Sequence, residues 1–161
     1  MSKEKFIFFW NGPLSQWWHC AFVIDGIAYN TAEQYMMAEK ARLFGDTETE
    51  GKIMASDIPT EQKQLGREVK NFDPDKWNAV AKDVVRRGSH AKFTQSPFLK
   101  ELLLGTAGAT LVEASPYDKI WGIGLREADP RAKDRATWLG TNWLGEVLTQ
   151  ERDLIASEET P

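Results

Sequence analysis

The chain has 161 residues, of which 42% are hydrophobic and 27% are charged, and its formal net charge is -4. This length and composition suit one globular domain that is large enough to bury a proper core. No apolar run approaches the ~20 residues that are needed to span a bilayer, so we expect no membrane association. The acidic balance argues against broad binding to nucleic-acid backbones, which requires a basic surface.

Cysteine content and the first residues of the chain indicate the cellular compartment. The single cysteine, Cys20, excludes an internal disulfide and favours a reducing compartment. The apolar stretch that ends at Trp10 is too short for a signal peptide, and no small-residue cleavage site follows it. We therefore expect a cytoplasmic protein. Cys20 lies between bulky neighbours, so we expect a small buried side chain there and no catalytic thiol.

The first part of the chain predicts short strands followed by a long helix. Aromatic and β-branched residues favour strands, and Asp25-Gly26 favours a tight turn between two of them. Thr31 or Asn30 can cap the helix, and Gly45 tolerates the left-handed backbone of a helix end. The expected elements are strands at 5–10, 21–24 and 27–30, and a helix at 31–44.

The middle of the chain predicts further helices that are separated by proline breaks. A proline is tolerated in the first turn of a helix because its missing N–H would be unpaired there. Apolar residues recur with helical periodicity in each segment. Gly88 either ends the helix that is expected to begin at residue 74 or bends it. In the second case residues 89–94 continue that helix. The expected helices are 46–54, 59–69, 74–87 and 97–104.

The last part predicts a strand, a long irregular segment and a final helix. The strand is expected at 110–114, and the helix begins at Thr141 or Asn142 and is followed by a polar, frayed tail after Ile155. So long an irregular stretch as 115–138 is either a functional loop or disorder, and its two tryptophans favour a loop that closes over a ligand. The sequence thus predicts a single α+β domain over 1–161, mostly helical, with its core at about 5–155 and a small β-sheet made by segments distant in sequence.

The common catalytic and metal-binding motifs are missing from the sequence. His19 and His90 lie far apart without cysteine neighbours, and no HExxH, Walker or GxSxG pattern occurs. The glycine pair at Gly122 and Gly124 lacks the third glycine of a dinucleotide fingerprint. We therefore expect neither a metal site nor a cofactor.

Carboxylates, cations and aromatic residues remain as candidates. Glu33 and Lys40 share one face of the long helix, which is otherwise apolar. On these residues alone, a first-turn glutamate that favours the helix dipole and a lysine that reaches to water are the favoured explanation. Surface charge is likewise the alternative for Arg67 and Lys92, and a loop cap for Asp118. Asn142 opens a helix whose free N–H groups would bind an anion, and seven tryptophans exceed what a small core needs.

Taken together, these residues resemble a known family. The chain resembles the NADAR superfamily over almost its whole length, from about Phe8 to Val147, and the motifs occur in the family's order. The motifs are Thr31-Ala32-Glu33-Gln34-Tyr35, Lys40, Phe44-Gly45-Asp46, Leu65-Gly66-Arg67, Trp77, Lys92-Phe93, Leu111 to Ala114, Ser115 to Gly124, and Trp138 to Gly145.

The resemblance implies an α+β enzyme that hydrolyses an N-glycosidic bond without metal or cofactor. It implies catalytic roles for Glu33 and Asp118. It implies substrate-binding roles for Trp77, Trp121, Lys40, Arg67, Lys92, Asn142 and Gly122.

The expected partner is a small molecule or a modified nucleotide that carries ADP-ribose. We favour ADP-ribosylated guanine, as a nucleoside or in DNA. Early riboflavin-pathway ribosylamino-pyrimidine phosphates are the alternative substrate, and a non-catalytic module that binds ADP-ribose is the alternative function. Gln34 replaces the family's usual His, and Ser15-Gln16-Trp17 replaces its Ser-Asn-Phe, so we expect these positions to bear on which base is accepted. The sequence leaves the oligomeric state open.

Overall fold

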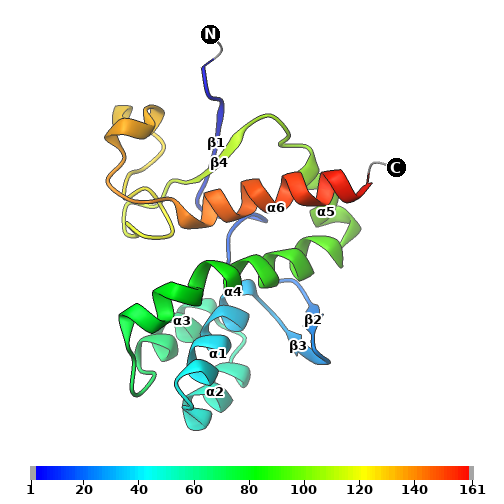
Figure 1. Cartoon of the computed structure of the whole chain (residues 1–161), viewed down its shortest axis with the longest axis vertical. Helices are drawn as coiled ribbons and strands as arrows, with labels where there is room; N and C mark the ends of the chain where they lie inside the picture. The colour runs from blue at the N-terminus through cyan, green and yellow to red at the C-terminus, as the bar shows by residue number, and fades with distance from the viewer. Residues whose placement is uncertain (1–2, 160–161) are drawn as a thin grey trace. The chain divides into compact units, whose positions relative to one another are not determined.

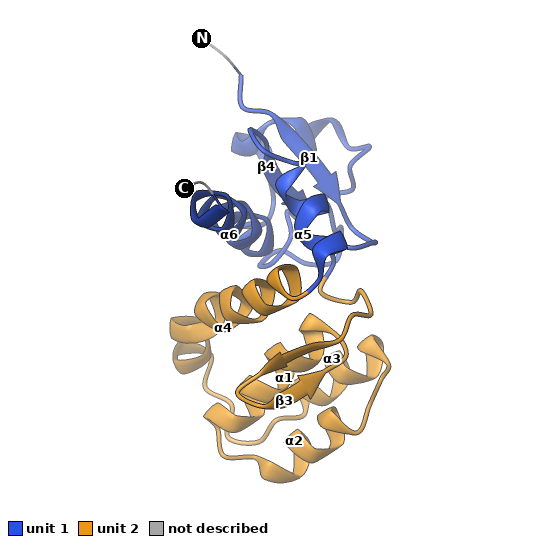
Figure 2. Cartoon of the chain, turned by 90° about the vertical axis from the view of Figure 1, so that its right-hand side faces the viewer, with its two compact units in different colours: residues 1–15, 96–161 blue, residues 16–95 orange. Residues whose placement is uncertain are grey.

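The computed structural model describes residues 3–159, and the chain divides into two compact units (Figure 2). Unit 1 is formed by residues 1–15 and 96–161, and unit 2 by the continuous stretch 16–95. Helices predominate and the strands are short (Figure 1), which confirms the α+β class. The expectation of a single domain stays a prediction. Within the described residues, no helix combines the length and the apolar character that crossing a bilayer requires.

Unit 2 packs three helices and a hairpin around a central helix. Strand β2 (Phe22–Ile24) pairs antiparallel with β3 (Ile27–Tyr29), as the sequence predicts. The central helix packs against the other three helices of the unit. These helices are α1 (Ala32–Leu43) at the centre, then α2 (Thr47–Met54), α3 (Pro59–Arg67) and α4 (Pro74–Thr94).

Capping residues explain where the helices of unit 2 begin. The side chain of Thr31 accepts a hydrogen bond from the Gln34 N–H at 3.0 Å, and Asp46 does the same for the Thr49 N–H at 3.1 Å. Both bonds satisfy N–H groups that have no partner inside the helix. Asp73 caps α4, with a proline in its first turn. The helix starts are therefore local features that the sequence predicts correctly.

The uninterrupted course of α4 answers the question left open at Gly88. The helix passes through this glycine without a break. A Cβ atom at Gly88 would lie 2.8 Å from Cδ2 of Tyr35, so only glycine lets α4 approach α1 this closely. Tyr35 also packs edge-on against Tyr29, with ring centroids 5.0 Å apart. Aromatic packing between α1, α4 and the hairpin thus builds the core of unit 2.

Unit 1 joins two distant segments through a parallel strand pair. Strand β1 (Phe6–Phe9) pairs with β4 (Thr110–Glu113), with Phe6 opposite Thr110. This pairing confirms the prediction of a small sheet between segments distant in sequence. The hairpin of unit 2 forms a separate two-stranded sheet. A buried cluster of Val112, Ile123, Leu125 and Ala132, with Phe6, Phe8 and Trp138 packed on it, forms part of the core of unit 1.

The helices of unit 1 are α5 (Pro97–Leu104) and α6 (Trp143–Glu159), which pack against each other. Helix α6 begins at Trp143 and continues beyond Ile155, so the prediction of a frayed tail directly after Ile155 is wrong. Lys100 on α5 forms an ion pair with Glu159. This ion pair joins α5 to the part of α6 that follows Ile155, and the sequence does not reveal it.

The long segment 115–138 is irregular, as predicted, but it is held by hydrogen bonds. It contains two short 3-10 helices, η1 (Pro130–Lys133) and η2 (Arg135–Thr137). The indole N–H of Trp138 donates to the Ala132 carbonyl at 2.7 Å. The structure therefore favours the ordered loop over disorder, and closure of this loop over a ligand stays a prediction.

Candidate functional site

Glu33 lies in the first turn of α1, two residues after the Thr31 cap. Its side chain is buried, with only 5% of the residue exposed. The backbone N–H of Glu33 donates to the carbonyl of Gln16 at 3.0 Å. This bond satisfies one of the N–H groups at the start of the helix, and it attaches the turn at 16–18 to the residue that the sequence predicts as catalytic.

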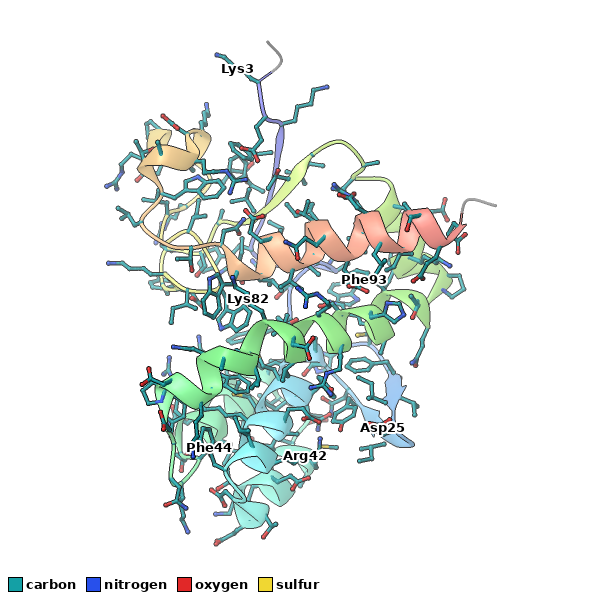
Figure 3. The ribbon with its side chains drawn as sticks, in the orientation of Figure 1. Lys3, Asp25, Arg42, Phe44, Lys82 and Phe93 are labelled. Atoms are coloured by element: carbon teal, nitrogen blue, oxygen red, sulfur yellow. The ribbon has the colours of Figure 1, made fainter. Side chains whose placement is uncertain are left out.

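Lys40 lies near this carboxylate within unit 2. Burial lowers the pKa of Lys40; the charge of Glu33 opposes that shift, and the charge of Arg67 adds to it. Lys40 therefore interacts electrostatically with both Glu33 and Arg67. The Lys40 ammonium also lies over the Phe72 ring, 4.5 Å from its centroid. Phe44 packs on Phe72 at 5.6 Å, and it projects to the side of α1 opposite Arg42 (Figure 3).

Close packing of α3 on α1 accompanies this arrangement. A Cβ atom at Gly66 would lie 1.9 Å from the Met37 sulfur, so the absence of a side chain there allows the short approach. Arg67 follows Gly66 at the end of α3 and is exposed. Two cations, the half-buried Lys40 and the exposed Arg67, thus lie on neighbouring helices and are suited to an anionic ligand.

Trp77 and Lys92 lie on α4, near its two ends. Trp77 is buried, and Lys92 is only 2% exposed. Burial lowers the pKa of Lys92 to about 8, and the charge of Cys20 opposes the shift. Burial in turn raises the pKa of the Cys20 thiol. The expectation that Lys92 is an ordinary surface charge is therefore wrong, and its contact with substrate stays a prediction.

Asp118 caps a turn in unit 1. One of its carboxylate oxygens accepts from the N–H groups of Ile120 at 2.9 Å and Trp121 at 2.8 Å. The carboxylate thus fixes the backbone that carries Trp121, whose ring packs edge-on against Trp143 at 5.5 Å. Close packing also accounts for Gly122, since a Cβ atom there would lie 2.9 Å from the Glu113 carbonyl oxygen. Catalytic and binding roles for these residues stay predictions.

Asn142 is fully buried and bonded to the free edge of β4. Its amide oxygen accepts from the Glu113 N–H at 2.9 Å, and its amide nitrogen donates to the Leu111 carbonyl at 3.0 Å. The side chain therefore takes the place of a neighbouring strand. Its backbone has a φ of 52°, in the left-handed region that asparagine tolerates better than most residues.

The helix start at Asn142 differs from the sequence expectation. The N–H groups of residues 141–144 donate to the carbonyls of Lys119, Gly122, Ile120 and Trp121. These groups are therefore not free, and the expectation of an anion site formed by them is wrong. The sequence predicts the helix start correctly, but it cannot show that the carbonyl groups of a distant loop accept hydrogen bonds from the N–H groups there.

The predicted site residues fall on both units. Unit 2 carries Glu33, Lys40, Arg67, Trp77 and Lys92, and unit 1 carries Asp118, Trp121, Gly122 and Asn142. The charges of Glu33 and Arg67 both act on Lys40.

Phe72 lies near this group and was missed as a site candidate, whereas Gln16 was expected to bear on the choice of base but not to bond the backbone of Glu33. For Phe72, the signal was an aromatic residue directly before the Asp73-Pro74 break.

The side chain of Gln34 holds neighbouring backbone segments together. Its amide oxygen accepts from the Asn30 N–H at 2.8 Å, and its amide nitrogen donates to the carbonyls of Ile53 and Ser56, both at 3.1 Å. These bonds tie α1 to the end of α2 and the loop that follows. Because the amide is buried and fully engaged with backbone groups, this departure from the family pattern bears on the packing of α1.

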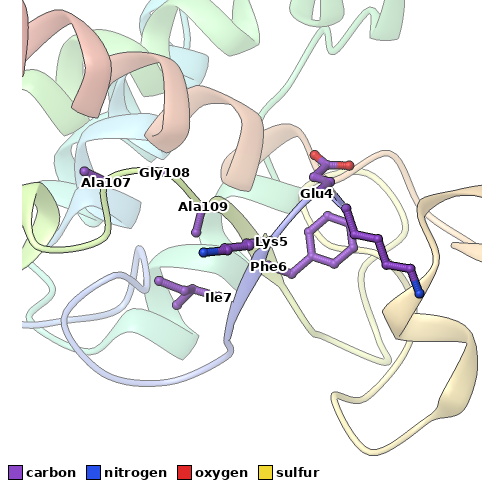
Figure 4. A pocket seen from close by; sticks show the side chains of 8 residues that line it. Glu4, Lys5, Phe6, Ile7, Ala107, Gly108 and Ala109 are labelled. Atoms are coloured by element: carbon purple, nitrogen blue, oxygen red, sulfur yellow. The ribbon is translucent and has the colours of Figure 1, made fainter. Parts of the chain in front are cut away.

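An open hollow on unit 1 includes none of the predicted residues. It lies beside β1 and the turn before β4, and is lined by Lys3 to Ile7 and by Ala107 to Ala109 (Figure 4). Among residues 3–159, no three His, Cys, Asp or Glu side chains gather as a metal site would require. The Glu33 group on α1 and α3 is therefore the candidate site with the most support from geometry.

Comparison with known proteins places this geometry in a family. The chain is 41% identical to N-glycosidase R617 of Acanthamoeba polyphaga mimivirus, across 95% of this chain and 98% of that protein. It is 33% identical to the chloroplastic riboflavin biosynthesis protein PYRR of Zea mays, across 81% of this chain but only 20% of that protein.

A solved structure agrees over the whole fold. N-glycosidase YbiA of Escherichia coli K12 is 32% identical, across 84% of this chain and 76% of that protein. The NMR structure of Escherichia coli YbiA superposes with a TM-score of 0.80 at 29% identity, covering 99% of this chain and 89% of that one. The NADAR domain model matches residues 8–156. The chain therefore belongs to the NADAR domain family.

Proposed function

We propose that this protein is an N-glycosidase in which Glu33 is the principal catalytic carboxylate. The observation that carries the proposal is the burial of this acid at the start of α1, near Lys40, on which the charge of Arg67 also acts. Relatives that align with most of the chain are named N-glycosidases, which supports the reaction class.

The chemistry of the reaction suits a buried carboxylate. When the bond between ribose C1′ and a base nitrogen breaks, positive charge develops on the sugar ring. A carboxylate near C1′ stabilises that charge and can take a proton from the attacking water. The base leaves with the bonding electron pair and gains a proton. Aromatic residues such as Phe72, which is 43% exposed, offer flat faces to a bound ring.

For the substrate we favour ADP-ribose attached to guanine. Lys40 near Glu33, together with Arg67 on the neighbouring helix, suits the diphosphate of such a ligand, because charged donors bind phosphate oxygens strongly. The net charge of -4 suits a small ligand or one modified nucleotide better than a long nucleic-acid tract. Asp118, Trp121 and Lys92 are further residues to be tested for an effect on turnover.

Early riboflavin intermediates are the second candidate substrate. The similarity to a plant protein named for riboflavin biosynthesis favours them, although the match covers a fifth of that protein. They also carry a ribose and a phosphate, so the same cations would serve. A binding module that holds ADP-ribose without cleaving it is the rival from another class.

The deciding experiment is a substrate panel analysed by chromatography and mass spectrometry. ADP-ribosylated guanosine, ADP-ribosylated DNA and ribosylamino-pyrimidine phosphates are each incubated with the protein. We expect release of a free base from at least one of them. Glu33→Gln keeps the shape of the side chain, and we expect it to reduce turnover roughly 10²- to 10⁴-fold.

Glu39→Gln is the matched control, since Glu39 lies on the same helix and pairs with Arg42 at 3.0 Å. We expect it to keep normal turnover. Full activity of Glu33→Gln would refute the assignment of the carboxylate. Intact substrates together with calorimetric binding of ADP-ribose would favour the binding module.

A further inference from the structure

The turn at residues 16–18 lies against the proposed catalytic residue. The Gln16 carbonyl accepts the Glu33 N–H at 3.0 Å. The amide nitrogen of Gln16 donates to the sulfur of Met36 at 3.8 Å. Met36 follows Glu33 by three positions, so the two side chains share a face of α1. The Gln16 side chain therefore runs along the same side of the helix as Glu33.

The Gln16 amide keeps hydrogen-bonding capacity. Its nitrogen bonds a thioether sulfur, which is a weak acceptor, and its oxygen has no partner among residues 3–159. The residue is only partly buried. A primary amide offers a donor and an acceptor side by side, and such a pair matches the edge of a nucleobase that presents both kinds of group.

Trp17 presents a large flat surface next to this amide. The residue is 40% exposed, although an indole is normally buried for most of its area. The ammonium of Lys63, on α3, lies 5.9 Å from the centre of its ring. A cation at this distance favours a defined position of the indole. An exposed, oriented aromatic ring is what stacking on a planar base requires.

We propose that Gln16 and Trp17 form the subsite for the leaving base. The base stacks on the Trp17 indole, and the Gln16 amide bonds an edge that presents a donor beside an acceptor, as both guanine and adenine do. A two-ring purine covers more of an indole than a one-ring pyrimidine, so this subsite selects purines. The inference rests on the proposed function, because Glu33 defines where the reacting sugar carbon lies.

A nucleoside titration tests the subsite without hydrolysis. The protein carries Glu33→Gln and ¹⁵N-labelled tryptophan, and the indole N–H signals are followed by NMR as guanosine or cytidine is added. The Trp17 signal is identified by its loss in Trp17→Ala. We expect guanosine to shift this signal and to bind more tightly than cytidine. We expect Trp17→Ala to weaken guanosine binding at least about 5-fold, the lower end for a stacked base.

Trp18→Ala is the matched control, since it removes the same side chain from the neighbouring position of the turn and Trp18 is 39% exposed. We expect its guanosine affinity to change by less than about 2-fold. Gln16→Leu keeps the volume and removes both polar atoms. We expect it to weaken the binding of guanosine and adenosine alike, while stacking continues to shift the Trp17 signal.

The outcomes separate this inference from the proposed function. A Trp17 signal that does not respond to guanosine, or an equal loss of affinity in Trp17→Ala and Trp18→Ala, would overturn the subsite even if turnover depends on Glu33. Full turnover in Glu33→Gln would overturn the catalytic assignment, while the titration would still report whether a base stacks on Trp17.

Discussion

At the scale of single residues, Lys92 is a cation that is almost completely removed from water. Its pKa is lowered to about 8 in the folded protein, from an ordinary value of 10.5. Between these values the unfolded chain holds the proton and the folded chain does not. Because the unfolded state binds more protons than the folded state over this pH range, the free energy of unfolding increases as pH rises. Lys92 therefore costs stability at neutral pH, and this cost disappears as the pH rises from about 8 to about 10.5.

A comparison with Lys92→Met tests this effect. Both chains carry Cys20→Ala, so that the neighbouring thiol does not titrate. We expect the stability of the lysine form to improve relative to the methionine form by roughly 2 kcal/mol between pH 7 and pH 10. Urea unfolding at several pH values, followed by circular dichroism, measures the difference. A difference that does not vary with pH would show that Lys92 stays charged inside the folded protein.

Asn142 and Asp118 show how far single residues can be interpreted from sequence. Both were recognised as short polar side chains at turns, and both do bond backbone groups. The local role of Asp118 follows from its neighbours two and three positions away. Asn142 bonds a strand that lies roughly 30 positions earlier in the chain, and no local pattern contains that information.

At the scale of secondary structure, Gly145 decides how closely α6 approaches β4. A Cβ atom at this position would lie 2.1 Å from the Leu111 carbonyl oxygen and 2.4 Å from the amide oxygen of Asn142. Neither atom can move without breaking the bonds between Asn142 and β4. Gly145 thus holds the edge of the parallel strand pair in contact with the start of α6.

We expect Gly145→Ala to lower the free energy of unfolding by about 2–4 kcal/mol, because it overpacks a site bounded by backbone. Gly51→Ala in α2 is the control, since nothing lies within 4 Å of a Cβ atom there. The control should stabilise the protein by about 0.5–1 kcal/mol, because alanine favours helix. Urea titration of both variants measures the contrast. Equal effects of the two changes would contradict the packing argument.

Helices were predicted better than their contacts. Caps and prolines are encoded within a few residues, so the starts of α1, α4 and α5 follow directly from the sequence. The continuation of α4 through Gly88 depends on Tyr35, more than 50 positions away, and α6 begins where a loop supplies carbonyl partners. Periodicity cannot reveal such partners.

At the scale of the whole molecule, the two units differ in how the chain forms them. Unit 2 is one continuous stretch, whereas unit 1 needs residues 1–15 together with residues 96–161. Within residues 3–159, β1 is the only strand that pairs with β4, and its Phe6 and Phe8 pack on the buried cluster around Val112. Half of the sheet of unit 1 is therefore missing from any fragment that begins at residue 96.

We expect the fragment 16–95 to keep its helical circular dichroism signal and to unfold cooperatively in urea. It contains the aromatic core of Phe22, Tyr29 and Tyr35 and the helices packed around α1. The fragment 96–161 should show no cooperative transition by itself, because β4 lacks its partner. A cooperative transition of 96–161 alone would contradict the role given to β1.

The pairing of β1 with β4 also sets an order of events during synthesis. The segment Phe6–Phe9 is made before its partner strand, which follows roughly 100 residues later. At a synthesis rate of about 5–20 residues per second, this apolar segment remains without its partner strand for on the order of 5–20 s. Such segments associate readily with other chains. Lys3, Glu4 and Lys5 precede it, and charges in this position act as gatekeepers against aggregation while the chain is incomplete.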